Sequence, residues 1–405
     1  MVVGQEAINR YLWDVENLPA TPPIRVATGR TLKVVADSTP GRFGGMKLIP
    51  EIIEVDASGR GRLLQLLKSI LANTYFKGTE IFNKEYTVED LLTILLKELK
   101  VRAENATGEK LNKVVIGRPV KYVGERPNEK LAIERMEEIS KRVGFKEMKL
   151  EYEPVGAALN FGLDIKQDSN VLIFDFGGGT LDVCIMKFPE KKIIAVSGRP
   201  IGGDFLKIKI FLNKILHYFG AKTTFGGGKL EIPRHLMIAL ENWYAIAQMK
   251  NKRNLDSLES LIGNADDPKP FENLRELILS DTGFKIYQEI DRIKVELSNK
   301  DESRIKFTGL SFEIDEKITR KEFEKMIETQ LQQTKELLDE VINFAKMNME
   351  DIDSVITTGG SSNIPVFKKL LTDYFMPEKV QFGESFISVA SGLALRSQEL
   401  FGYNE

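Results

Sequence analysis

The sequence contains almost no cysteine or histidine, and this limits its chemistry. Among 405 residues, Cys184 is the single cysteine, and His217 and His235 are the two histidines. One cysteine cannot form an intrachain disulfide, and it fits a reducing compartment. Three such residues also fall short of the four ligands that a structural zinc site needs. The sequence therefore predicts neither a disulfide framework nor a Cys/His zinc site.

Long apolar runs and an excess of charge of either sign are also missing. No run reaches the roughly 18 apolar residues of a membrane span. Residues 1–15 include Glu6, Arg10 and Asp14, charges that a secretory signal would not carry. Lysine plus arginine number 57 and aspartate plus glutamate 59, so the net charge of −2 argues against nucleic acid or an anionic membrane as a partner. We expect a cytoplasmic protein.

The composition is that of an ordinary folded protein. Apolar residues make up 42% and charged residues 29%, which is typical of a globular chain. A length of 405 residues predicts two or three domains. The loosest segments are 20–62 and 251–270, and we expect each as an excursion on the surface.

Helix and strand patterns recur in the same order in the two halves. The first half predicts helix, strand, helix, strand and helix at 88–104, 112–117, 128–143, 148–152 and 154–163. The second half predicts strands at 170–176, 180–188 and 192–198, a helix at 203–219, and mostly helical sequence to Ser298. An alternating strand at 304–314 then precedes helix, strand, helix, strand and helix at 320–346, 353–358, 364–375, 379–382 and 387–400. We interpret this as an internal duplication whose first copy lacks the three-strand opening, and a coincidence of lengths is the alternative.

Local signals support several of these boundaries. Thr87 with Asp90, and Thr319 with Glu322, match the capping box that opens a helix. Gly144 follows the predicted helix of 128–143 and indicates its end.

The sharpest local signal is DFGGGTLD, from Asp175 to Asp182. A strand ends at Asp175, three glycines turn the chain, and Thr180 opens the returning strand. Glycine backbone can approach an oxyanion closely, and a carboxylate at a strand end can hold hydrated magnesium or align a water. The alternative is a plain hairpin, although three consecutive glycines lose more entropy than a two-residue turn requires. The motif favours a phosphate and metal site.

Two further glycine pairs are weaker candidates. Gly202 and Gly203 precede a helix, and Gly359 and Gly360 lie between a strand and a helix. Backbone amides at either place could touch a ligand. Such turns favour glycine in any case, so each pair alone is weak evidence and the three turns together are stronger.

Two charged residues have a functional and a plainer interpretation. Glu153 precedes Pro154 at a helix start, where it could be a general base or a magnesium-associated acid, or could simply meet the helix dipole. Lys68 lies beside an apolar stripe, where a snorkelling surface lysine is the plainer interpretation.

Other motifs of nucleotide and hydrolase sites are absent. The sequence has no G-x-x-x-x-G-K-[ST] string of a P-loop protein and no G-x-S-x-G elbow. The run FGGGKLE at 225–231 lacks the serine or threonine and the spacing of a phosphate loop, so we expect an exposed turn there.

Six strings together resemble one family. They are EYEPVGAALNFGLD, VLIFDFGGGTLDVCIM, GRPIGGDFLK, EIDRIKVELS, ITRKEFEKMI and VITTGGSSNIPVFKKLLTDYF. In order and spacing, across about residues 65–400, the sequence resembles the nucleotide-binding domain of DnaK-type (seventy-kilodalton heat-shock, Hsp70) chaperones, in the actin-like ATPase superfamily. VVIGRPVKYVG looks closest to the stand-alone YegD-like members, which have the ATPase domain without the peptide-binding domain. This chain likewise stops at Glu405, after the expected final helix of that domain.

The resemblance implies an α/β fold, the actin-like ATPase (duplicated ribonuclease-H-like) fold of two lobes with a nucleotide cleft between them. Lobe I would span residues 1–167, with 1–109 at its periphery, and lobe II residues 168–377, with 204–316 at its periphery. Residues 378–405 would return to lobe I. The implied function is binding and slow hydrolysis of ATP with magnesium, in an Hsp70-like chaperone without a peptide-binding domain.

The resemblance also implies site residues by motif position. Asp175 would orient magnesium and water, Asp182 would stand close to it, Glu153 would help to position both, and Lys68 would contact the γ-phosphate. The β- and γ-phosphates would be wrapped by Gly177, Gly178, Gly179 and Thr180. The ribose and adenosine contacts would come from Gly202, Gly203, Asp291, Lys294, Ser298, Gly359, Gly360, Ser361 and Ile364.

The sequence departs from the family's pattern at three places. Asn363 replaces the arginine common there, which puts a base-stacking contact in doubt, and Phe386 stands where many chaperones carry an acidic residue. The family's opening strand and G-x-D-x-G-T loop, its first phosphate loop, do not occur in residues 1–60. A start methionine assigned too late, a truncated gene or a degenerate nucleotide binder would each explain this, and we favour the first two. We expect hydrolysis to be severely weakened.

Other functions stay open at this point. After the Hsp70-like ATPase, the second hypothesis is a non-hydrolysing module that reports ATP binding to a partner. The third is an actin-like filament protein, which would polymerise with nucleotide. A sugar kinase is a distant fourth. The expected ligand is a nucleotide (ATP or ADP), a protein client or co-chaperone is a possible partner, and we expect a monomer.

Overall fold

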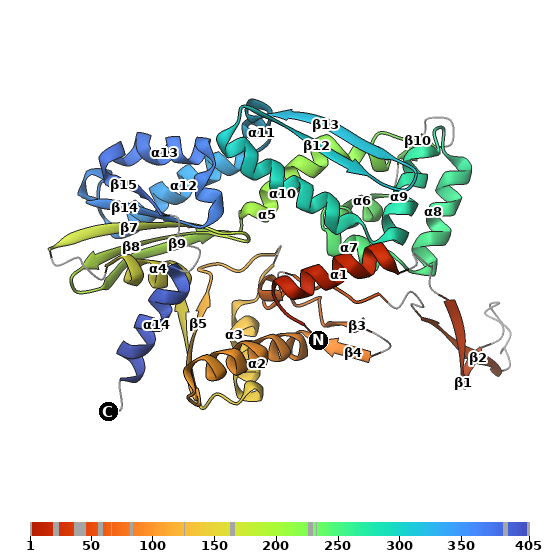
Figure 1. The fold of residues 1–405 in the computed structure, drawn as a ribbon, viewed down its shortest axis with the longest axis horizontal. Helices are drawn as coiled ribbons and strands as arrows, with labels where there is room; N and C mark the ends of the chain where they lie inside the picture. Colours follow the sequence, from red (N-terminus) through yellow and green to blue (C-terminus); the bar gives the residue numbers. More distant parts are fainter. Residues whose placement is uncertain are drawn as a thin grey trace, which may run out of the picture.

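The structure is a computed structural model. It describes residues 2–18, 24–35, 46–55, 60–65, 67–81, 84–124, 126–162, 167–225, 230–231, 233–383 and 388–402. Phe386 and the glycines of the run at 225–231 lie outside these described residues. The elements are arranged in two lobes, and Figure 1 draws the second lobe above the first.

A five-stranded sheet forms the centre of the second lobe, in the order β15-β14-β7-β8-β9. β7 and β8 form the predicted antiparallel hairpin around three glycines, and β14 runs parallel to both β7 and β15. The strands span Ser169–Phe176 (β7), Leu181–Phe188 (β8), Lys192–Arg199 (β9), Ser354–Thr358 (β14) and Val380–Phe382 (β15). The predicted strands and the glycine hairpin are confirmed.

Apolar side chains cover both faces of this sheet. Val171 and Ile173 of β7 share a buried cluster with α4 (Glu153–Phe161). Leu172, between them, belongs to the main core together with α13 (Pro365–Phe375). Because successive strand residues point to opposite faces, a strand buried on both faces reads as an unbroken apolar run, as VLIF does.

The first lobe is built on β5 (Lys113–Arg118) and β6 (Glu147–Tyr152), which pair in parallel. Within the described residues, these are the two strands of its sheet. α2 (Val88–Thr107) and α3 (Glu129–Val143) pack on each other over a shared apolar cluster. A short turn, η1 (Leu67–Ile70), precedes them, and two small strands, β3 (Gly78–Ile81) and β4 (Lys84–Thr87), lead into α2.

Both predicted capping boxes are confirmed. At the start of α2, the hydroxyl of Thr87 accepts from the N–H of Asp90, and the Asp90 carboxylate accepts from the N–H of Thr87. Thr319 and Glu322 form the same pair of bonds at α11 (Arg320–Met326). Each box satisfies two backbone donors that a helix start leaves without partners.

The two lobes repeat one order of elements. α2, β5, α3, β6 and α4 in the first lobe correspond to α12 (Glu328–Ala345), β14, α13, β15 and α14 (Ser388–Phe401) in the second half. The last helices of the two copies, α4 and α14, cross with their backbones in contact. At the crossing, a Cβ on Gly392 would overlap the carbonyl oxygen of Gly156. The order is the one that an internal duplication predicts.

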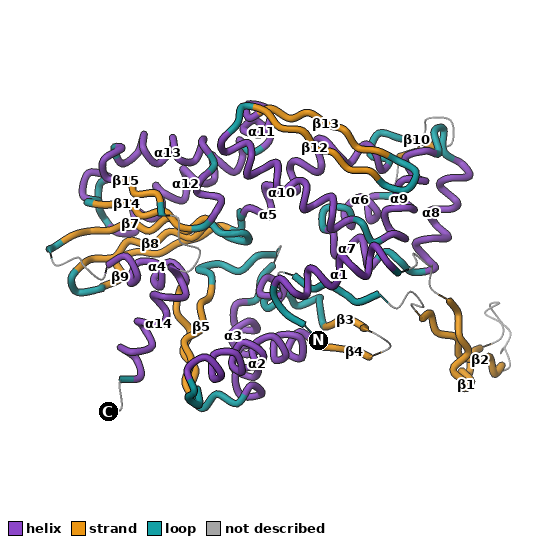
Figure 2. The backbone as a smooth tube through the Cα atoms, in the orientation of Figure 1, coloured by secondary structure: helices purple, strands orange, loops and turns teal. Residues whose placement is uncertain are grey.

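A mostly helical region and a β-hairpin lie between β9 and β14 (Figure 2). The helical region starts with α5 (Gly203–Ile210), which continues through the turns η3 (Phe211–Ile215) and η4 (Leu216–Phe219). The following elements are β10 (Thr224–Phe225), β11 (Leu230–Glu231), α6 (Arg234–Ala239), α7 (Trp243–Gln248), α8 (Lys252–Asn264), α9 (Lys269–Ser280) and α10 (Gly283–Asn299). The hairpin consists of β12 (Glu302–Thr308) and β13 (Glu313–Thr319).

Three expectations for this region hold only in part. Residues 304–314, expected as one strand, contain the turn of the β12–β13 hairpin, because Gly309 donates its N–H to the carbonyl of Phe312 (2.8 Å) and reverses the chain. Residues 251–270, expected as a surface excursion, include α8, which buries two leucines. The helix expected at 320–346 is divided at Ile327 into α11 and α12.

An N-terminal helix and hairpin precede the first lobe. α1 (Gln5–Asn17) lies against the second lobe, near α7 and α10 (Figure 1), and the ring of Tyr11 contacts Phe284 edge to face at 5.8 Å. β1 (Ile24–Val35) and β2 (Met46–Val55) form an antiparallel hairpin at the edge of the molecule. No helix among the described residues is both long and apolar enough to cross a membrane.

Two of these contacts cut across the expected division of the chain. α1, within the segment 1–109 assigned to lobe I, is packed on the second lobe. β15, within the segment 378–405 expected to return to lobe I, is hydrogen-bonded to β14 in the second lobe's sheet. α14, which follows β15, packs against both α4 and β5 of the first lobe.

Candidate functional site

Three strands of the five-stranded sheet end at one edge, and glycines follow each end. β7 leads into Gly177–Gly179, β9 leads toward Gly202 and Gly203, and β14 leads into Gly359 and Gly360. β8 is antiparallel to both β7 and β9, and β14 is parallel to β7, so β7, β9 and β14 run in the same direction. The sheet therefore gathers three glycine turns that are far apart in the sequence.

Hydrogen bonds join these turns to one another. The N–H of Gly203 donates to the carbonyl of Gly177 (3.0 Å), and the N–H of Asp204 donates to the carbonyl of Gly178 (2.8 Å). The hydroxyl of Ser361, in the turn η6 (Gly360–Asn363), also donates to the carbonyl of Gly177 (3.3 Å). The hairpin tip is thus held from both sides by the other two turns.

Close packing requires glycine at two of these positions. A Cβ on Gly202 would overlap the backbone of Gly178. Gly359 has a φ of 80°, in the left-handed region that favours glycine, and a Cβ there would overlap the backbone of Phe176. The hairpin tip and the turn at Gly202 therefore meet through their backbones, and the Ser361 hydroxyl joins the third turn to them.

Four charged side chains predicted from the sequence lie beside these glycine turns. Lys68, in η1, and Glu153, at the start of α4, form an ion pair. Asp175 and Asp182 face each other across the β7–β8 ladder, and 8% and 1% of their surface is exposed. The first lobe thus contributes an ion pair, and the second lobe two buried carboxyls.

Burial and neighbouring charges raise the pKa of both aspartates. Burial raises the pKa of Asp175 from 3.8 to about 7, with the carboxylates of Glu153 and Asp182 adding to the shift and Lys68 opposing it. Burial also raises the pKa of Asp182 to about 7, against hydrogen bonds from the Thr180 hydroxyl and a backbone N–H. Three carboxyl groups beside one lysine leave negative charge in excess, so the arrangement suits a cation.

Asp182 also links the two lobes. One carboxylate oxygen accepts from the hydroxyl of Thr180 (2.7 Å), in its own lobe. The other accepts from the N–H of Val120 (3.0 Å), in the loop between β5 and α3 of the first lobe. Sequence reasoning missed Val120, because a backbone donor leaves no signature in the residue type.

A second charged group borders the glycine turns on α5 and α10. Lys207 pairs with Asp204 (2.6 Å) and with Asp291 (2.9 Å), and Lys294 pairs with Asp291 (3.2 Å). A Cβ on Gly203 would lie 3.0 Å from the Lys294 amine. Burial lowers the pKa of Lys294, whereas in Lys207 the two carboxylates outweigh burial and raise the pKa. Sequence reasoning missed Asp204, which directly follows the glycine pair, and Lys207, which lies three residues further along α5.

The remaining predicted residues are not all at the turns. Ser298 lies one helical turn beyond Lys294, and its hydroxyl donates to the Lys294 carbonyl (3.3 Å). Ile364 is 3% exposed and belongs to the main hydrophobic core, so its side chain does not line an open surface.

The carboxylates suit a hydrated ion better than a closed metal site. Within the described residues, no three or more His, Cys, Asp or Glu side chains are grouped so that they could hold a metal. Magnesium usually keeps several waters and takes one or two carboxylates together with phosphate oxygens. Asp175 lies beside the glycine turns, where the carboxyl groups outnumber the single lysine. It therefore fits that mode of binding.

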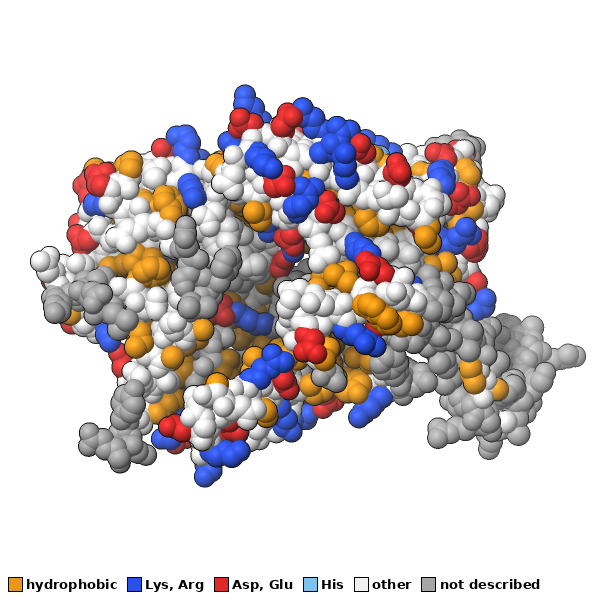
Figure 3. Space-filling view, viewed as in Figure 1, with side chains coloured by type: hydrophobic (Ala, Val, Ile, Leu, Met, Phe, Trp, Pro, Cys, Tyr) orange, Lys and Arg blue, Asp and Glu red, His pale blue; other side chains and the backbone are white. Residues whose placement is uncertain are grey.

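The site lies where the two lobes face each other. The face drawn in Figure 3 is hollowed between the lobes, and acidic and basic side chains meet there. One side of the site comes from η1 and α4, and the other from the ends of β7, β9 and β14. A ligand bound at the turns would therefore contact both lobes.

A duplicated α/β protein with two lobes and a glycine-lined site between them has the actin-like ATPase fold. The sequence model of the family "Hsp70 protein" matches residues 69–207 and 280–404, which is more than half of the chain. The chain belongs to the Hsp70 family.

Curated relatives agree with this assignment. The "Chaperone protein DnaK" of Thermotoga petrophila is 24% identical over 382 residues, which cover 88% of this chain and 55% of the relative. The protein of the same name from Thermosipho africanus is 25% identical over 366 residues (87% and 52%), and that from Methanothermobacter thermautotrophicus 25% over 334 residues (80% and 47%). The chain spans about half the length of the curated relatives it matches.

Proposed function

We propose that these 405 residues bind ATP or ADP with magnesium between the two lobes and hydrolyse ATP slowly, as the nucleotide-dependent region of a chaperone-like protein. One observation carries the proposal. Three glycine turns are hydrogen-bonded to one another next to two buried aspartates. Backbone amides bind phosphate oxygens, and carboxylates hold the metal that accompanies them.

The proposed contacts follow the order of the turns. Gly177, Gly178, Gly179 and Thr180 surround the β- and γ-phosphates. The ribose and the adenosine are contacted by Gly202, Gly203, Asp291, Lys294, Ser298, Gly359, Gly360, Ser361 and the backbone of Ile364. The buried Lys294 and the pair Asp204–Lys207 lie beside these contacts and hold Asp291 in place.

Catalysis would consist of positioning and electrostatic stabilisation. Asp175 is the proposed magnesium ligand, and the bound ion would neutralise charge on the transferring phosphoryl group. Glu153 orients the attacking water, and Lys68 donates to a γ-phosphate oxygen. Their ion pair keeps the two side chains aimed at the same place. Asp182 fixes the hairpin to the loop of the first lobe through Val120.

We also propose the lobe boundaries of the sequence analysis, with residues 1–167 and the returning segment 378–405 in lobe I and 168–377 in lobe II. The contacts of α1 and β15 described above are exceptions within this division. A protein client or co-chaperone, a monomeric state and a cytoplasmic location complete the proposal, in keeping with the chain's family.

A non-hydrolysing module that reports ATP binding to a partner is the second candidate. The observation in its favour is that all three glycine turns come from the second lobe. Phosphates would then be bound from one side, which suffices for affinity but weakens the stabilisation of the transition state.

Calorimetric titration with magnesium-ATP tests the proposal. We expect micromolar affinity, a loss of about tenfold or more in Asp175→Asn, and no change in Asp339→Asn, which removes an exposed carboxylate of α12. A folded chain that binds no nucleotide, or an Asp175→Asn variant with unchanged affinity, would contradict it. Turnover measured on the same samples separates hydrolysis from the non-hydrolysing alternative.

A further inference from the structure

Lys68 is carried by a segment that cannot hold its own position. It lies in η1, a single turn of four residues, none of which is buried. The Lys68 side chain is 44% exposed. A single helical turn is unstable on its own, since it fixes several dihedral angles for few hydrogen bonds. Leu67 and Ile70 pack partly buried against the apolar cluster of the first lobe, and polar contacts from outside η1 complete the placement of Lys68 beside Glu153.

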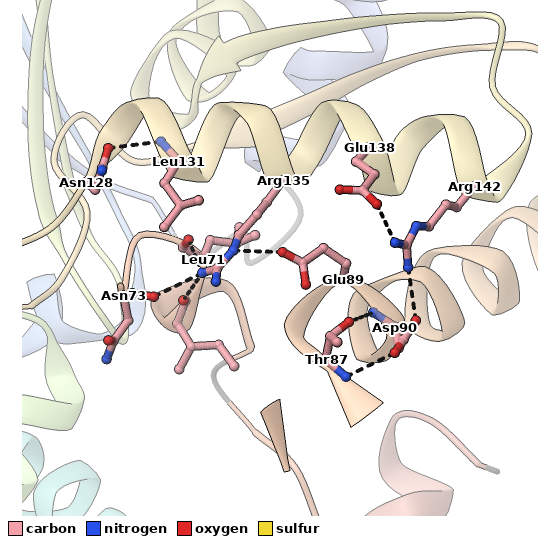
Figure 4. Close-up of polar contacts among 11 residues, drawn as sticks. Leu71, Asn73, Thr87, Glu89, Asp90, Asn128, Leu131, Arg135, Glu138 and Arg142 are labelled. Atoms are coloured by element: carbon pink, nitrogen blue, oxygen red, sulfur yellow. Dashed lines mark hydrogen bonds and ion pairs between the residues drawn. The ribbon is translucent and has the colours of Figure 1, made fainter. Parts of the chain in front are cut away.

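A buried arginine on α3 holds the chain directly after η1. Arg135 is 8% exposed, and its Nη1 donates to the carbonyls of Leu71 (2.8 Å) and Asn73 (3.0 Å), with the carbonyl of Ile70 at 3.3 Å. Figure 4 shows the guanidinium pointing from α3 into this loop. Its Nε is ion-paired with Glu89 of α2 (2.8 Å).

These contacts add side-chain donors to the carbonyls that follow η1. The carbonyls at the end of a helical turn have no donor within that turn, and that of Ile70 also accepts from the N–H of Asn73 (3.1 Å). A single nitrogen of the guanidinium, Nη1, reaches all three carbonyls. A backbone bond from Asn128 to the carbonyl of Ala72 (2.9 Å) adds a second tie between the loop and the start of α3.

The residues that Arg135 holds lie only a few positions from Lys68 in the sequence. One residue separates Lys68 from Ile70, and the N–H of Leu71 donates to the Lys68 carbonyl (3.3 Å). Residues 70–73 are thus fixed to α3, and η1 extends from them toward Glu153. We propose that Arg135 is a positioning residue that aims Lys68 at Glu153 and at the nucleotide phosphates. The second half of this statement rests on the proposed function of the site.

Arg142 provides a matched control on the same helix. Like Arg135, it links α3 to the first turn of α2, through Asp90 (3.0 Å), and it is also paired with Glu138 (Figure 4). Among the contacts of the described residues, it has none to residues 67–73. Arg142→Gln therefore removes an α2–α3 ion pair and leaves the Lys68 segment untouched.

The first experiment needs no nucleotide. Lysines of the full chain are reductively dimethylated with 13C, and the Lys68 signal is identified by its loss in Lys68→Arg. We expect Glu153→Gln to shift this signal in the otherwise unchanged chain. In Arg135→Gln the Lys68 signal should move toward those of exposed lysines and lose its response to Glu153→Gln, whereas Arg142→Gln should preserve both. A Lys68 signal that keeps its position and its response in Arg135→Gln would overturn the proposal.

Arg135→Lys guards against a variant that fails to fold. It keeps a positive charge beside Glu89 but replaces the planar guanidinium by an ammonium group of different reach and geometry. We expect partial loss of the Lys68 response in Arg135→Lys. A complete response in a folded Arg135→Lys would show that ammonium donors hold the loop equally well, and would overturn the specific role of the guanidinium.

The second experiment measures turnover of magnesium-ATP. Arg135→Gln should lower kcat by about tenfold to a hundredfold and leave KM within about twofold, since a displaced catalytic group costs rate more than affinity. In a Lys68→Met background, Arg135→Gln should cause no further loss, because both changes remove the same interaction. If the two substitutions lower kcat independently, so that their effects multiply in the double variant, the proposal is contradicted. A chain without any turnover would contradict the proposed hydrolysis, while the nucleotide-free signal of Lys68 would still decide the role of Arg135.

Discussion

Asp175 is the residue at which function and stability conflict most clearly. The folded chain raises its pKa from 3.8 to about 7, mainly by burial and then by the carboxylates of Glu153 and Asp182. The folded state therefore binds this proton more tightly than the unfolded state does. The contribution of Asp175 to the free energy of unfolding must then fall as pH rises from about 4 to about 7, and stay level above that.

Asp175→Asn should accordingly stabilise the nucleotide-free chain while it weakens magnesium-ATP binding. We expect a gain of about 2–4 kcal/mol in the free energy of unfolding at pH 8, and a smaller gain at pH 5. Urea denaturation of the two chains at both pH values measures this difference, with Asp339→Asn as the control. An equal gain at both pH values would show that the charge of Asp175 is not its cause.

Gly202 tests whether backbone contact between the turns is required. A Cβ there would overlap the backbone of Gly178, which cannot move without displacing the hairpin. We expect Gly202→Ala to lower the free energy of unfolding by about 1–3 kcal/mol and to weaken nucleotide binding.

Gly263 is the matched control for this substitution. It lies within α8 and has open space around it, so Gly263→Ala should raise stability by about 0.5–1 kcal/mol. Thermal unfolding of both variants distinguishes the cases. A Gly202→Ala variant as stable as Gly263→Ala would mean that the turns do not meet as described.

At the scale of elements, α1 is attached to the second lobe by apolar packing and by the polar contacts of one arginine. The guanidinium of Arg60 donates to the carbonyls of Ser280 (2.7 Å) and Leu18 (2.7 Å) and pairs with Asp281 (3.1 Å). Its side chain is 5% exposed. The Tyr11 hydroxyl adds a bond to the carbonyl of Asp281 (3.1 Å).

Arg60→Met should therefore destabilise the chain strongly. It leaves a buried carboxylate with one partner fewer and the carbonyls of Ser280, Val15 and Leu18 without this donor, a loss that typically costs about 3–5 kcal/mol. Arg102→Met is the control, because Arg102 pairs with Glu98 through side chains that are 54% and 42% exposed, and such pairs contribute about 0–1 kcal/mol. Chemical denaturation followed by circular dichroism gives both values, and similar small losses in the two variants would refute the anchoring role of Arg60.

At the scale of the whole molecule, the first lobe contacts the second at three places. α4 shares a buried cluster with β7, the Asp182 carboxylate accepts from the loop of the first lobe, and α1 packs on the second lobe beside α10. α14 returns to the first lobe, where its backbone touches that of α4 at Gly156 and Gly392.

Much of the site could be predicted because its signals are local. Three glycines after an aspartate-ended strand, a glycine pair before a helix and capping boxes at Thr87 and Thr319 depend on residues a few positions apart. Backbone conformation at such short range follows from sterics and nearby hydrogen bonds. The order of helices and strands in the two halves could be predicted for the same reason.

The rest depended on contacts between distant segments. Val120 reaches Asp182 through a backbone N–H, and the Arg135 guanidinium binds three carbonyls, groups that every residue carries. The hairpin at 302–319 was missed because alternation alone does not show where a strand reverses. By itself, the sequence determined the order of elements, the glycine turns and the family. Only the tertiary structure decided which turns meet, which carboxyls are buried together and what holds Lys68, because burial and pairing depend on distances that sequence spacing does not define.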